Sequence, residues 1–152
     1  MKLIATILLS LIILQFIQAK DLSKNLPEEV TKYMNDNYPK ATKVEWIKAK
    51  NYNCDTAIYQ AHFYNNGMLV TLEITKEGKV LAKETQLKIN EIPEALNFYI
   101  QGHKIKFVAV VEYHDESPVY ILETKYKKHS DFKVFNANGT SVHHIRKHFL
   151  LL

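Results

Sequence analysis

Cysteine is nearly absent from this chain of 152 residues, which contains only Cys54. A single cysteine excludes an internal disulfide framework, so packing and sheet hydrogen bonds must stabilise the fold. Cys54 falls in a predicted turn, and no catalytic motif surrounds it. We interpret it as incidental, with a disulfide between two chains as the alternative.

Motifs of catalysis and phosphate binding are also lacking. The four glycines form no Gly-rich phosphate loop, and the sequence contains neither a Gly-x-Ser-x-Gly elbow nor a His-Glu-x-x-His motif. The paired carboxylates Asp115 and Glu116 lie in a predicted turn, where solvation accounts for them. We therefore predict a protein that is not an enzyme and that needs no cofactor.

Basic residues are scattered along the whole chain and form no single long basic stripe. The chain's 20 Lys and Arg residues and 16 Asp and Glu residues give a net charge of +4. A nucleic-acid-binding protein would be expected to concentrate its basic residues in one stripe. Because the basic residues are interleaved with acidic ones, we predict no nucleic-acid partner.

The long hydrophobic run is at the N-terminus. Lys2 precedes the apolar segment Leu3–Ile17, and Ala19 follows at a signal-peptidase position. The run is shorter than the roughly 20 residues that cross a bilayer. We predict a signal peptide over residues 1–19 and one exported domain over residues 20–152, periplasmic or secreted, with no stable membrane insertion after cleavage. A retained anchor is the alternative.

Two segments of the mature chain resemble each other. Asn25–Met34 and Glu91–Ile100 both read aliphatic-Pro-Glu-x-aliphatic-x-x-Tyr-aliphatic. Proline favours the first turn of a helix, and the apolar residues recur at helical spacing. We predict two helices, the first ending before Pro39 and the second capped by Gly102.

The period changes to two after each predicted helix. Alternating segments separated by Gly, Asn and Asp turns predict antiparallel strands over residues 44–49, 56–64, 68–75, 80–87, 105–113, 119–126, 132–135 and 140–149. The pattern predicts an α+β fold of two pseudo-repeats, at about residues 24–88 and 89–152. Each repeat would contribute one helix and about four strands to one sheet with both helices on one face.

Several of these segments carry a family resemblance. They are Leu26–Val30, Asn37–Ala41, and the turns Ile74–Lys79 and Phe135–Thr140. In this order the chain resembles the PepSY-like, beta-lactamase-inhibitor-like proteins exported by Bacteroidetes-type bacteria, over nearly the whole mature chain. The second repeat departs from the pattern because it lacks the Tyr-Pro pair after its helix. The resemblance implies a helix-on-sheet fold and a binding or inhibitory role outside the cytoplasm, and no contact residues carry over.

The second half is apolar on both strand faces. If helices cover only one face, an apolar surface is left for an unidentified protein partner. Its candidate residues are Val108, Val110, Val119 and Ile121. We therefore predict a binding module that recognises or inhibits another protein through an open sheet face. The alternative is that both faces are covered, for instance by the second subunit of a homodimer.

Trp46 is a further candidate contact residue. It is the only tryptophan, and Val44 shares its strand face. Tryptophan is enriched where binding energy concentrates. Burial in the core is the alternative, because an indole buries a large area.

The C-terminus is rich in histidine. On a helix, His144 and His148 would share a face and could bind zinc. A glycine turn precedes the segment, however, so we predict a strand, in which Arg146 lies between the two histidines. We predict no metal site, and keep a carrier of a small ligand or metal that uses this end, including His143, as the alternative function.

Overall fold

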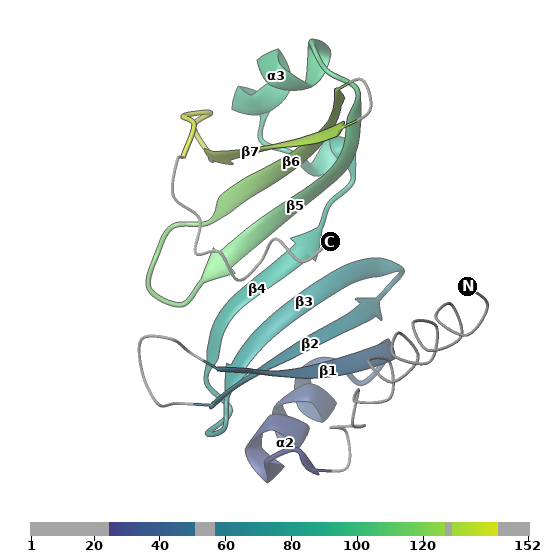
Figure 1. The fold of residues 1–152 in the computed structure, drawn as a ribbon, viewed down its shortest axis with the longest axis vertical. Coiled ribbons are helices and arrows are strands. Elements are labelled where there is room, and N and C mark those ends of the chain that lie inside the picture. Colours follow the sequence, from purple (N-terminus) through teal and green to yellow (C-terminus); the bar gives the residue numbers. More distant parts are fainter. Residues whose placement is uncertain (1–24, 51–56, 127–128, 143–152) are drawn as a thin grey trace, which may run out of the picture.

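A single antiparallel sheet dominates the computed structural model, which describes residues 25–50, 57–126 and 129–142 (Figure 1). Within these residues the sheet has seven strands in the order β1 to β7, so each strand pairs with its neighbours in sequence. The strands are β1 (Thr42–Lys50), β2 (Ala57–Asn65), β3 (Met68–Thr75), β4 (Val80–Gln86), β5 (Ile105–Tyr113), β6 (Val119–Tyr126) and β7 (His129–Asn136).

The first helix, α2 (Glu28–Asn37), follows the sequence signals closely. Pro27 precedes it, and Glu28 and Glu29 place negative charge in its first turn, where the helix dipole favours it. The helix ends at Tyr38, whose backbone N–H donates to the Met34 carbonyl over 2.8 Å. Proline cannot continue this hydrogen-bond pattern, so the chain leaves the helix before Pro39.

The prediction of two helix-plus-four-strand repeats is wrong. The second segment forms two short 3₁₀ turns, η3 (Ile89–Glu91) and η4 (Glu94–Leu96), and a helix of five residues, α3 (Asn97–Gln101). The helix ends at Gln101, and Gly102 follows as its C-terminal cap. The described part of the chain is therefore mostly β, with two short α-helices.

The strand count of the second half also differs from the prediction. In the part of the chain that the structure describes, Ser141 forms only an isolated bridge with Phe135, and the rest of the strand predicted over residues 140–149 lies outside the described residues. No sheet boundary separates the halves, because Ala82–Gln86 of β4 pairs directly with Ala109–Tyr113 of β5.

Short turns set the order of the first strands. Asn66 and Gly67 have φ values of 52° and 80° and link β2 to β3. Positive φ at both central residues matches the twist of a hairpin, so Asn-Gly is favoured there. Strands joined by such turns must be antiparallel neighbours.

The two faces of the sheet differ in cover. On the face that we call the helix face, α2 packs over Phe63, Leu72 and Ile74. Farther along the same face, Leu96 packs over Val108, Leu122 and Phe135. Figure 1 shows α2 beside the β1 end and α3 at the β7 end. The opposite face carries a second apolar cluster formed by Ala82, Val111, Ile121 and Val134.

Candidate binding groove between α2 and β1

A half-open cavity of about 300 Å³ lies between α2 and β1. We call it the α2–β1 groove. Its lining comes from one side of the helix, from the turn that follows, and from the start of the strand: Leu26, Thr31, Met34, Asn35, Tyr38, Pro39, Ala41, Val44 and Trp46. A concave, mainly apolar site with a few polar side chains is the common form of a binding pocket.

The turn after α2 places the two walls side by side. The backbone N–H of Ala41 donates to the Tyr38 carbonyl over 3.0 Å, which closes the turn. The ring of Tyr38 packs edge-on against Phe63 with 4.8 Å between centroids. Burial raises the pKa of Tyr38 to about 12, with a smaller contribution from Tyr33. The Tyr38 hydroxyl therefore stays neutral, and it hydrogen-bonds with Tyr33.

A β-bulge shapes the strand side of the groove. Lys43 and Val44 together oppose a single residue of β2, because pairing jumps from Thr42 to Glu45. Lys43 has a φ of 54°. Bulges re-aim side chains and increase local twist, and here Val44 joins the groove lining, 39% exposed, while the Lys43 ammonium lies 5.4 Å from the Tyr64 ring centroid.

β1 is also exposed on the face away from α2. Ile47, the partner of Gln60, is 45% exposed, and Tyr64 on the neighbouring strand is 39% exposed. Because β1 is the first strand of the sheet, it is accessible on both faces: Val44 is exposed in the groove on the helix face, and Ile47 and Tyr64 are exposed on the opposite face. We call this set of residues the β1 edge.

Of the residues predicted to bind a partner, only Trp46 lies in the groove. It is half-buried and packs toward the cluster under α2. Val108 and Val110 pair with Leu122 and Tyr120, which puts them on the helix face.

The other two predicted contact residues, Val119 and Ile121, lie on the opposite face beside Val111. Val108 and Ile121 are each only 2% exposed. The four residues of the second half therefore do not form one surface.

The predicted histidine and cysteine features lie elsewhere. His143, His144 and His148 and the lone Cys54 all fall outside the described residues. Among the residues that are described, no group of three or more His, Cys, Asp or Glu side chains could hold a metal ion. None of the described helices is long and apolar enough to cross a membrane.

Buried polar side chains occupy the opposite face of the first half. Gln60, Thr71, Glu73 and Glu84 are each buried, between 3% and 8% exposed. Burial raises the pKa of Glu84 to about 7. His62 Nδ1 lies 3.0 Å from Thr71 Oγ1, and burial lowers its pKa. Glu84 therefore changes its protonation near neutral pH, and His62 takes up its proton below its usual range, so this face is a source of pH-dependent stability.

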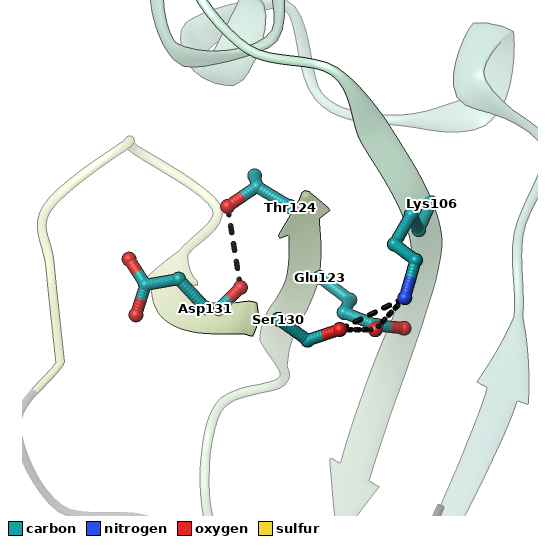
Figure 2. Close-up of polar contacts among 5 residues, drawn as sticks. All are labelled: Lys106, Glu123, Thr124, Ser130 and Asp131. Atoms are coloured by element: carbon teal, nitrogen blue, oxygen red, sulfur yellow. Dashed lines mark hydrogen bonds and ion pairs between the residues drawn. The ribbon is translucent and has the colours of Figure 1, made fainter. Parts of the chain in front are cut away.

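A second polar cluster lies on the surface of the second half (Figure 2). The Lys106 ammonium donates to Glu123 Oε1 and to Ser130 Oγ, each over 2.8 Å. The Ser130 hydroxyl also donates to Glu123. Hydrogen bonds from Lys106 and then Ser130 lower the pKa of Glu123. This arrangement joins β5, β6 and β7.

Sequence reasoning missed the groove, although one signal for it was visible. Val44 and Trp46 share a strand face directly after the Tyr38-Pro39 turn, so an apolar strand face next to a helix end was predictable. The bulge at Lys43 was not, because neither glycine nor proline marks it.

No family model and no curated protein matches this chain. Solved structures match its fold. A candidate periplasmic protein of Bacteroides eggerthii is 18% identical, with a TM-score of 0.65 over 77% of this chain and 86% of that chain. A DUF2874 family protein of Bacteroides uniformis is 18% identical, with a TM-score of 0.63 over 76% and 86%.

A BLIP-like protein of Bacteroides fragilis is 21% identical, with a TM-score of 0.59 over 78% of this chain and 84% of that chain. The inhibitor-like part of the predicted resemblance agrees with this neighbour, whereas a PepSY relationship is not shown. The chain thus has the fold of the DUF2874 and BLIP-like proteins of Bacteroides.

Proposed function

We propose that this chain is an exported, non-catalytic binding module that recognises another protein through the α2–β1 groove and the β1 edge. The observation that carries the proposal is the exposure of Val44 and Ile47, 39% and 45%, on the two faces of an edge strand that also lines a cavity. Large apolar side chains exposed on an unpaired sheet edge mark a candidate interaction site.

The groove is a better candidate than the sheet face of the second half. Val108 and Ile121 are 2% exposed and would need a local opening before any partner could touch them. Trp46 and Tyr38, by contrast, already line a cavity. Aromatic side chains in such pockets are the usual anchors of protein interfaces.

Export is part of the proposal. It is supported by the signal-peptide pattern of residues 1–19 and by the shared fold with a candidate periplasmic protein. A fold shared with a BLIP-like protein supports binding as the activity. Whether the bound partner is inhibited is a finer question, to be asked once the partner is known.

The test is a comparison of exposed variants. The mature protein, residues 20–152, would be immobilised and exposed to envelope and secreted fractions, alongside Val44→Glu and Ile47→Glu. We expect a saturable partner that both substitutions release. Ile89→Glu is the matched control, since Ile89 is 56% exposed and lies in η3, away from the groove.

Folding is checked in the same series. All three variants should keep the wild-type circular dichroism and melting temperature, because exposed substitutions change stability by only about 0.5 kcal/mol. A partner that is retained by both edge variants, or that is lost equally with Ile89→Glu, would contradict the proposed site.

A further inference from the structure

Resting on the proposed function, we infer that the partner presents an extended acidic segment that adds as a strand to the outer edge of β1. One of its apolar side chains enters the α2–β1 groove between Val44 and Trp46. Three independent features of the described residues support this occupant: the free edge, the position of the cavity, and the charge of the strand.

The edge offers backbone hydrogen-bonding groups. β1 is the first strand of the sheet and, in the part of the chain that the structure describes, pairs only with β2. An edge strand presents a row of N–H and C=O groups to which a peptide can add. Regular register runs over the six residues Glu45–Lys50, beyond the bulge. We therefore expect the added segment to be about six residues long, so that it can pair with the whole regular part of β1.

The cavity lies on the β1 side of α2. Thr31, Asn35 and Tyr38 of the helix line it, whereas Glu29, Lys32 and Asp36 line a shallow hollow on the other side of α2, beside Gly78. A strand laid along β1 points alternate side chains toward α2. The volume of the cavity, about 300 Å³, is at the lower limit for drug-sized ligands. This size suits a single large apolar side chain.

The basic charge of residues 40–50 indicates that the bound segment is acidic. Between Lys40 and Lys50 the chain has four lysines (40, 43, 48 and 50) and one glutamate (45), a net charge of +3. A second copy of β1 would bring the same charge, and like charges opposite each other destabilise strand pairs. A segment with carboxylates beside its apolar anchor is complementary to this edge.

The test uses acetylated heptapeptides as the probe. Each has glutamates at both ends and a central Leu, Phe or Ser, and binding to the mature protein is followed by fluorescence anisotropy at low salt. We expect the Leu or Phe peptide to bind at least tenfold more tightly than the Ser peptide. Replacing the terminal glutamates with lysines should abolish binding, because the edge is basic.

Backbone pairing has its own signature. N-methylation of every second residue should weaken binding at least tenfold, whereas methylation of the intervening residues should change it by less than twofold, since only alternate N–H groups face the partner strand. Equal effects at all positions would overturn strand addition.

Charge reversal completes the design. Lys40→Glu with Lys43→Glu should weaken binding of the acidic peptide and favour the lysine-flanked one, while Lys104→Glu, an exposed lysine before β5, should do neither. No binding by any peptide, or a dimer of the protein that Val44→Glu dissociates, would overturn the acidic segment as occupant. The proposed function would still stand if envelope capture remained sensitive to Ile47→Glu, so the two failures are distinguishable.

Discussion

The two ends of this sheet differ in the residues that lie on the face opposite the helices. In β1–β4 the face opposite α2 carries buried polar residues, among them Thr71, Glu73 and Glu84. In β5–β7 the same face carries Val111, Ile121 and Val134, packed as a second apolar cluster. The first half therefore carries buried titratable groups and an accessible edge, while the second half depends on apolar packing on both faces.

The largest expected effect comes from a charge in the two-sided core. Val108→Glu on the helix face and Ile121→Glu on the opposite face each bury an unpaired carboxylate in a site that is 2% exposed. We expect each to cost more than about 4 kcal/mol, enough to unfold a marginally stable domain. Urea unfolding followed by circular dichroism measures the loss.

An exposed substitution provides the scale for that result. Val44→Glu, in the groove of the first half, should change the free energy of unfolding by about 0.5 kcal/mol or less. A folded Ile121→Glu protein that loses under 1 kcal/mol would break the comparison, because it would show that the opposite face of the second half is an open surface after all.

The next effect separates the halves by pH. Burial raises the pKa of Glu84 to about 7 from 4.5, so the folded state holds a proton that the unfolded state releases. Stability from this group is therefore fully present below about pH 4.5 and lost as pH rises through 7. The difference corresponds to about 3 kcal/mol. Glu84→Gln should remove this loss in urea titrations at pH 4.5 and 7.5.

His62 acts with the opposite sign on the same face. Burial lowers its pKa below 6.5, so the unfolded state takes up the proton first and stability falls as pH drops below that value. Comparing wild type with Glu84→Gln at each pH cancels this contribution. If both proteins lost the same stability between pH 4.5 and 7.5, the loss would not come from Glu84.

Two turn glycines, Gly67 in the first half and Gly139 in the second, differ in the space around them. A Cβ at Gly139 would lie 2.8 Å from the Ala95 carbonyl oxygen, with φ at 85°, whereas Gly67 has φ at 80° and nothing within 4 Å. Gly67→Ala should cost about 1 kcal/mol from backbone strain alone. Gly139→Ala should cost about 2–3 kcal/mol because η4 must also move. Equal losses of stability in thermal unfolding would show that η4 moves away from the added methyl group at little cost.

Much of the strand pattern was predictable because it is local. Met68–Thr75, Ile105–Tyr113 and Val119–Tyr126 have the predicted bounds, since alternation and turn residues specify a hairpin within a few residues. The length of the second helix was not, because the Pro-Glu signal at Pro93 starts a helix without stating how far it continues before Gly102.

The candidate site was predictable only in part, because it depends on register. Alternation along β5 indicated that Val108 and Phe107 point to opposite faces of the sheet. It could not show which residues of β6 share the face of Val108. A shift of one residue exchanges the two faces of a strand, and the observed pairing Val108↔Leu122 separates Val108 from Ile121. Nor does Glu84 stand out in sequence, since an alternating polar residue is normally solvated and its burial depends on what lies over the sheet.

The smallest expected effect concerns the surface network of Lys106, Glu123 and Ser130 (Figure 2). Lys106→Met should cost less than about 1 kcal/mol, because exposed ion pairs are weak and screened by salt. Glu123 has a lowered pKa, so its stabilisation is present above about pH 4.5 and is lost as pH falls through the folded pKa. The difference between wild type and variant should therefore shrink in acid and at 1 M salt. A loss above about 2 kcal/mol that ignored salt would show that these three strands are held by this network rather than by the apolar clusters on their two faces.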